Sequence, residues 1–129
     1  MIVLDTHALL WWTQNSDKLS SDAREVVEEA KAQNCIYVSS MSVWEVSMLV
    51  KKERLSLKQT SQDWLTQVEG LSFITFVPVN NQIAQNSVHL DMHPDPADRI
   101  IAATTLYLGA TLITKDEKLQ KLKDLKTLW

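Results

Sequence analysis

Short, mainly apolar runs alternate with stretches of helical periodicity along the whole sequence, and this alternation limits the folds open to the chain. Apolar runs of this length are typical of parallel strands, which are buried on both faces. Strands that alternate with helices predict an α/β fold, in which helices cover both faces of a parallel sheet. The predicted strands are residues 1–5, 35–39, 72–77 and 111–113, and residues 127–129 could add a last one.

Helices are expected in the connections between these strands. From Ser20 to Gln33, the apolar residues Ala23, Val26, Val27 and Ala30 recur at helical spacing. The remaining predicted helices begin near Thr6 and cover residues 41–52, 61–69, 80–90, 96–108 and 115–123.

Two details of these helices are specific enough to check. The only two glycines, Gly70 and Gly109, each follow a helical stretch, where a left-handed C-terminal cap favours glycine. Trp44 is expected to face the core from the helix at residues 41–52. A chain of 129 residues fits one compact domain, residues 1–129, with no room for a second.

Four acidic residues fall at the same edge of the predicted sheet. Asp5 ends the first strand, and Asp116 lies just beyond the fourth. Glu45 and Asp98 lie near the start of the helices at residues 41–52 and 96–108. Right-handed crossovers place the start of each such helix at the carboxyl edge of the strands, where parallel sheets bind ligands. We therefore expect the four side chains to converge.

Helix capping explains each acid equally well when it is taken alone. An aspartate after a strand caps the next helix, and an acid three residues after a serine or threonine forms a capping box. A proline at the first helical position, followed by an acid, suits the helix dipole. The capping candidates are Asp5, Ser42 with Glu45, Asp95 with Pro96 and Asp98, and Thr114 with Glu117, which leaves Asp116 a bystander.

Taken together, the four acids favour a metal site. Two carboxylates about 4 Å apart repel by about 4 kcal/mol at an effective dielectric constant near 20. The acids must therefore spread apart, take up protons or share a divalent cation. Oxygen ligands suit Mg²⁺ or Mn²⁺ better than zinc, and Cys35, His7, His89 and His93 have no zinc-site spacing.

Charge and composition restrict the setting of such a site. The net charge of −3 is unusual for a protein that binds nucleic acid, but two divalent cations would bring it to +1. The sequence shows no signal peptide and no apolar run of about 20 residues that would span a bilayer. With Cys35 as the only cysteine, we expect a reducing, cytoplasmic location and no membrane association.

The segments around the four acids resemble the motifs of VapC-type PIN-domain ribonucleases, the toxins of bacterial type II toxin–antitoxin pairs. The four segments occur in the family's order and span nearly the whole chain. They are residues 2–12 (IVLDTHALLWW), 38–45 (VSSMSVWE), 93–103 (HPDPADRIIAA) and 112–116 (LITKD).

This resemblance implies a three-layer α/β/α sandwich with a short central parallel sheet and a Mg²⁺ or Mn²⁺ site. It implies endonucleolytic cleavage of RNA by metal-activated water, leaving a 5′-phosphate and a 3′-hydroxyl. It also implies a cognate antitoxin and a homodimer. By their positions, Asp5, Glu45, Asp98 and Asp116 match the family's metal-binding catalytic acids, and Thr6, Asp95 and Thr114 match supporting positions.

Other functions stay open at this point. A PIN-fold nuclease that acts on DNA or in RNA processing would carry the same acids, and a catalytically inactive PIN scaffold would only bind partners. A phosphatase or phosphotransfer domain with Asp5 as nucleophile would have a second acid two residues later, where this chain has His7. Arg99 follows one of the four acids and could contact phosphate or pair with a nearby carboxylate, and the second, structural role is favoured.

Overall fold

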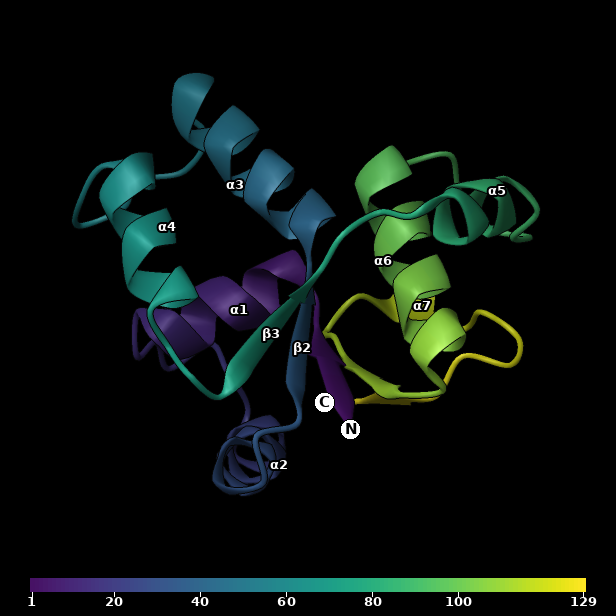
Figure 1. Ribbon diagram of the computed structural model, residues 1–129, viewed down its shortest axis with the longest axis horizontal. Helices are drawn as coiled ribbons and strands as arrows, with labels where there is room; N and C mark the ends of the chain where they lie inside the picture. The colour runs from purple at the N-terminus through teal and green to yellow at the C-terminus, as the bar shows by residue number, and fades with distance from the viewer.

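The centre of the molecule is a parallel sheet of five strands, seen in a computed structural model that describes residues 1–129 (Figure 1). The strand order is β3-β2-β1-β4-β5, and every neighbouring pair is parallel. The predicted parallel sheet is therefore confirmed. The strands are β1 (Ile2–Leu4), β2 (Ile36–Ser39), β3 (Ile74–Val77), β4 (Thr111–Ile113) and β5 (Thr127–Leu128).

Seven helices connect these strands, at the predicted places and with ends shifted by a few residues. The last helix is the clearest difference, because it covers only four residues where a longer one was predicted. The helices are α1 (Thr6–Thr13), α2 (Ser21–Ala32), α3 (Ser40–Lys51), α4 (Ser61–Glu69), α5 (Asn81–Val88), α6 (Pro96–Leu108) and α7 (Glu117–Gln120).

Successive strand residues face two different apolar cores, as the alternation of side chains along a strand requires. Leu4 of β1 packs in one core with residues of α1, α2, α3 and α4, among them the fully buried Trp64. Val3 packs in the other with Ile101 of α6 and Leu119 of α7. Figure 1 shows α1 to α4 gathered on one side and α5 to α7 on the other, so the fold is a three-layer α/β/α sandwich.

The direction of the chain across the sheet reverses at β1. From β1 the chain proceeds to β2 and β3 on one side, and then crosses back to form β4 and β5 on the other. Leu4 and Ile113 are register partners, so β1 and β4 end at the same level. Such a reversal leaves a crevice at the carboxyl ends of the two strands, because the segments that follow them diverge.

Two predictions about the helices are wrong. Gly70 ends α4 with φ −75°, in the right-handed region, whereas Gly109 ends α6 with φ 63° as predicted. Trp44 is 51% exposed, because α3 turns Ser42 and Val46 inward, and the residue midway between them faces away from both.

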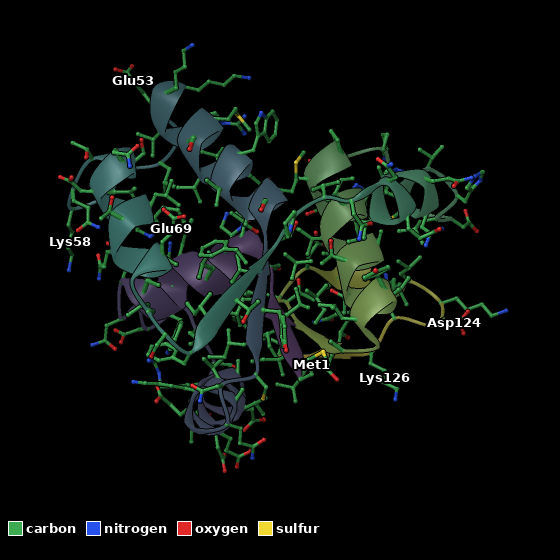
Figure 2. The ribbon with its side chains drawn as sticks, viewed as in Figure 1. Met1, Glu53, Lys58, Glu69, Asp124 and Lys126 are labelled. Carbon is green, nitrogen blue, oxygen red and sulfur yellow. The ribbon has the colours of Figure 1, made fainter.

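Charged side chains occupy the periphery, as Figure 2 shows for Glu53, Lys58, Asp124 and Lys126. None of the helices is long and apolar enough to cross a bilayer.

Candidate functional site

A polar cavity of about 570 Å³ lies at the carboxyl edge of the sheet, and all four predicted acids line it. Its walls come from the ends of β1 and β4 and the starts of α3 and α6. Trp11 is the only hydrophobic residue in the lining, so the cavity suits a charged or strongly polar ligand. The lining residues are Asp5, Thr6, His7, Trp11, Glu45, Asp95, Asp98, Lys115, Asp116 and Glu117.

Asp5 is the most deeply buried of the four acids, with 8% of its surface exposed. It caps α1, because its Oδ1 accepts a hydrogen bond of 2.8 Å from the backbone N–H of Ala8. Burial raises the pKa of the Asp5 carboxyl, while hydrogen bonds from the Thr114 side chain and from Ala8 oppose that rise. Asp5 is therefore both a helix cap and a cavity acid.

Glu45 reaches the cavity from the second turn of α3 and is partly buried. The predicted capping box with Ser42 is wrong, because Ser39 caps this helix by accepting a hydrogen bond of 3.1 Å from the backbone N–H of Met41. Ser42 instead accepts a hydrogen bond of 3.1 Å from the Thr6 hydroxyl. This buried bond ties the start of α1 to α3 and sets the position of Glu45 relative to Asp5.

Asp98 and Asp95 lie at the start of α6, where the predicted cap is confirmed. Asp95 is the N-cap and accepts a hydrogen bond of 3.1 Å from the backbone N–H of Asp98, with Pro96 at the first helical position. Burial and the negative charges of the neighbouring acids, Asp95 and Asp116 first, raise the pKa of the Asp98 carboxyl to about 7. Such a shift is the mark of carboxylates brought close together without a cation between them.

Asp116 is the N-cap of α7, and its Oδ1 accepts a hydrogen bond of 2.8 Å from the backbone N–H of Lys118. The predicted capping box of Thr114 with Glu117 is therefore wrong, and Asp116 is not a bystander. Thr114 is fully buried and accepts a hydrogen bond of 3.1 Å from the backbone N–H of Asp116. The Thr114 hydroxyl also opposes the rise in the pKa of Asp5, so it acts on two of the four acids.

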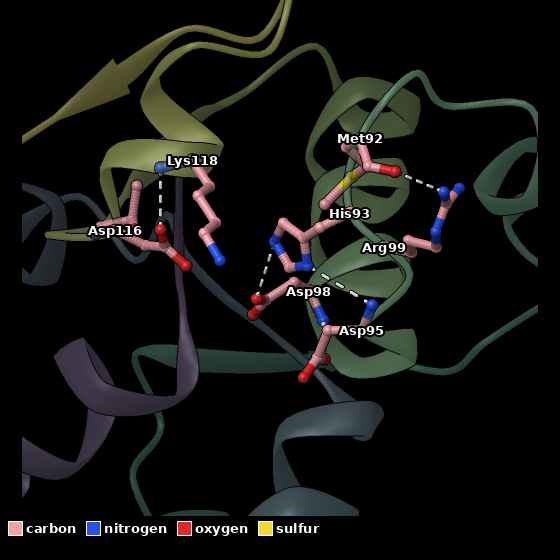
Figure 3. A network of polar contacts seen from close by, with 8 residues as sticks. Met92, His93, Asp95, Asp98, Arg99, Asp116 and Lys118 are labelled. Atoms are coloured by element: carbon pink, nitrogen blue, oxygen red, sulfur yellow. Dashed lines mark hydrogen bonds and ion pairs between the residues drawn. The ribbon is translucent and has the colours of Figure 1, made fainter.

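Arg99 has a structural role, as expected, but its partners are carbonyl oxygens and not a carboxylate. Its guanidinium donates hydrogen bonds to the carbonyl oxygens of Ser87 and Leu90, each at 3.0 Å. It also donates to the carbonyl oxygen of Met92, the bond that Figure 3 shows. These bonds fasten the segment between α5 and α6 to the start of α6. Arg99 does not line the cavity.

His93 lies beside the acids, although the sequence analysis did not assign it to the site. Its Nε2 is 3.3 Å from Asp98 Oδ2, and its Nδ1 accepts a long hydrogen bond of 3.4 Å from the backbone N–H of Asp95 (Figure 3). Ligand atoms of His93, Asp98 and Asp116 all lie within 4.8 Å of one another. The signal that could have found His93 is its position two residues before the Asp95 cap in the sequence.

The donor set of the cavity fits a hard divalent cation. Carboxylate oxygens come from four separate segments, and the raised pKa values of Asp5 and Asp98 show that the site disfavours this much negative charge in the absence of a cation. Asp5, Glu45, Asp98 and Asp116 could hold such an ion, with Thr114 behind them.

Comparison with known proteins identifies the family of the chain. Residues 2–125 match the family described as PIN domain. The chain is 31% identical over 121 residues to Ribonuclease VapC22 of Mycobacterium tuberculosis, a match that covers 92% of this chain and 89% of the relative.

Solved structures of similar fold include VapBC2 from Rickettsia felis bound to a DNA fragment from its promoter, with a TM-score of 0.72, 20% identity and coverage of 99% and 98% of the two chains. DNA-bound VapBC from Salmonella typhimurium is similar at a TM-score of 0.69, 18% identity and coverage of 98% and 96%. At these identities the structures bear on the fold alone. The family match and the VapC22 relative together show that the chain belongs to the PIN domain family and, within it, to the VapC-type proteins.

Proposed function

We propose that residues 1–129 form one nuclease domain, a Mg²⁺- or Mn²⁺-dependent endoribonuclease that acts as a VapC-type toxin. The observation that carries this proposal is the convergence of Asp5, Glu45, Asp98 and Asp116 on one polar cavity at the reversal point of the sheet. The name of the VapC22 relative supports RNA as the substrate.

The four acids have different tasks in the proposed reaction. Asp5 and Asp98 flank the principal cation, and Asp116 completes the site. A bound divalent cation supplies positive charge that lowers the pKa of water and stabilises the negative charge developing on the phosphate. Glu45 orients the attacking water and accepts its proton. Thr114 and Thr6 hold Asp5 and α3 in place, and Asp95 fixes the start of α6.

The proposed chemistry is hydrolysis of a phosphodiester. Water attacks the phosphorus, the bond from phosphorus to the 3′-oxygen breaks, and the leaving oxygen takes up a proton. The products are a 5′-phosphate and a 3′-hydroxyl. The protein's contribution is to place carboxylates where they can hold a cation beside the phosphate. The positive charge of the cation then offsets the negative charges of the carboxylates and of the phosphate.

The proposal includes a cognate antitoxin and a homodimer in the cytoplasm. Similar folds occur in VapBC assemblies and in a toxin–antitoxin complex from Klebsiella pneumoniae, which supports the antitoxin. Exposed apolar residues on α3, α5 and α6 support a further protein contact: Trp44, Val88 and Tyr107 are 51%, 72% and 51% exposed.

Incubation of the purified protein with total RNA tests the proposal. We expect cleavage with Mg²⁺ or Mn²⁺, none with a chelator, and 5′-phosphate ends on the downstream fragments. Asp98→Ala should be inactive, whereas Asp124→Asn, a change in an exposed acid that does not line the cavity, should cleave normally. Cleavage of DNA with intact RNA would contradict the substrate, and cleavage by Asp98→Ala would contradict the site.

A further inference from the structure

A second hollow of about 570 Å³ adjoins the acidic cavity and shares Asp95, Asp98 and Asp116 with it. The hollow differs from the cavity because His93 and Lys118 form its other wall. Figure 3 shows the His93 ring directed toward Asp98, with Asp116 on the facing side. An imidazole therefore stands at one end of a site whose other donors are all carboxylates.

The His93 ring nitrogen nearest the acids has no hydrogen bond of its own. Nε2 is fully buried yet has no hydrogen-bond partner, although it lies 3.3 Å from Asp98 Oδ2. The two atoms lie within ion-pair distance, but their alignment does not make a hydrogen bond. Neighbouring ligands on an octahedral ion at about 2.1 Å lie about 3 Å apart. The spacing of Nε2 and Oδ2 is close to this value, and one ligand atom from each of His93, Asp98 and Asp116 lies within 4.8 Å of the others.

The charges around these three residues are also unbalanced. The contact between His93 and Asp98 is the only ion pair in the structure, and Lys118 pairs with neither aspartate despite lining the same hollow. Two carboxylates and one nitrogen without a hydrogen bond thus face a common space, and the only lysine that lines it pairs with neither carboxylate.

We infer that His93 Nε2, Asp98 and Asp116 bind a divalent transition-metal ion, and that His93 makes this end of the site select Mn²⁺ over Mg²⁺. Nitrogen ligands strengthen the binding of transition metals, whereas Mg²⁺ prefers oxygen. The inference rests on the proposed function, because Asp98 and Asp116 are also proposed to hold a cation there. It adds to that function a ligand and a metal preference.

Ligation through Nε2 requires one hydrogen bond to change. A neutral histidine that binds metal through Nε2 carries its proton on Nδ1. Nδ1 then no longer accepts the hydrogen bond from the Asp95 N–H. This bond is 3.4 Å long and exposed, so water can take the place of the ring nitrogen at small cost. The alternative is that Nε2–H merely donates to Asp98, and the experiment must separate the two.

Electron spin-echo spectroscopy of bound Mn²⁺ separates them, because a directly bound ¹⁴N gives a nuclear coupling that a hydrogen-bonded ring does not. We expect this coupling in the full-length wild-type chain with Mn²⁺, its loss in His93→Gln, and its retention in His89→Gln, which changes an exposed histidine after α5. Calorimetric titration should show Mn²⁺ affinity reduced about tenfold or more in His93→Gln, with a smaller change for Mg²⁺.

The results distinguish this inference from the proposed function. Tight Mn²⁺ binding without nitrogen coupling in the wild type would overturn the inference and leave the carboxylate site standing. Coupling that persists in His93→Gln would also overturn it and would point to His7, the other histidine of the cavity. Failure of the wild type to bind Mn²⁺ or Mg²⁺ would overturn both. Only the wild-type spectrum is needed for the first result, so the test does not depend on the variant's folding.

Discussion

The Thr6 hydroxyl donates a hydrogen bond to the Ser42 hydroxyl across 36 positions of sequence, with both side chains buried. Thr6 directly follows Asp5, and Ser42 lies one helical turn before Glu45. This single polar contact therefore joins two segments that each carry one of the cavity acids.

Loss of this contact should weaken the fold. We expect Thr6→Val, which keeps the side-chain volume, to lower the free energy of unfolding by about 1–2 kcal/mol, because a buried Ser42 hydroxyl loses its donor. Urea unfolding measures this. The double variant Thr6→Val with Ser42→Ala should be less destabilised than the sum of the single changes, and strict additivity would show that the bond contributes nothing.

Replacement of Asp5 by Asn should separate activity from stability. The amide oxygen of Asn can still cap α1, and burial already disfavours the charge that is removed, so the melting temperature should change little. Loss of a metal-binding carboxylate should lower the rate of RNA cleavage by about 10²–10³-fold, equivalent to several kcal/mol. Near-normal cleavage by a folded Asp5→Asn protein would remove Asp5 from the proposed site.

The pKa of Asp98 makes the stability of the metal-free protein depend on pH. Its value of about 7 in the folded state lies above the ordinary 3.8, so the folded state binds the proton more tightly than the unfolded state. The contribution of Asp98 to the free energy of unfolding is therefore fully present below pH 4 and is lost as the pH rises toward 7. In the presence of a chelator, we expect this contribution to fall between pH 4 and pH 7.

Unfolding in EDTA at several pH values, compared with Asp98→Asn, isolates this contribution. The variant should lack the decline that the wild type shows between pH 4 and pH 7. Saturating Mn²⁺ should raise the melting temperature of the wild type more at pH 8 than at pH 5, because the cation competes with the proton for the same carboxylates. Equal stabilisation at both pH values would contradict the proposed cation site.

Arg99 should be needed to hold the segment between α5 and α6, which carries His93, in its folded conformation. Arg99→Lys keeps the charge but loses the planar set of donors that reaches several carbonyl oxygens, and we expect it to cost about 1–3 kcal/mol of stability. Hydrogen exchange should become faster in residues 88–95. The exposed Arg54→Lys is the matched control, and equal exchange in the two variants would show that the carbonyl contacts do not hold the segment.

Much of the fold could be predicted because its signals are local. The apolar strands and the cap at Asp95 depend on a few adjacent residues, and the rule for crossover helices then brings four acids to one edge. The exposure of Trp44 could not be predicted this way, since it depends on which face of α3 meets neighbouring helices. The conformation of Gly70 also depends on how the chain continues into β3.

The site was predicted less completely than the fold for a related reason. Each acid was found, but spacing could not decide which serine or threonine caps a helix and which makes a contact across the sheet. Ser42 has such a contact, with Thr6, whereas the buried Thr114 side chain accepts a hydrogen bond from the backbone N–H of Asp116. His93 joins the acids because Arg99 fastens the preceding segment to α6, and no periodic pattern records such a contact.

The central position of β1 has a consequence for the timing of synthesis. β1 precedes the other four strands of the sheet, but its neighbour β4 emerges from the ribosome only after β2 and β3, and Asp116 follows β4. A chain translated only as far as β3 therefore contains Asp5 without Asp98 and Asp116, the later acids of the cavity. The proposed cleavage site is therefore assembled only after Asp116 has been made, and a chain that stops before this residue should lack the proposed activity.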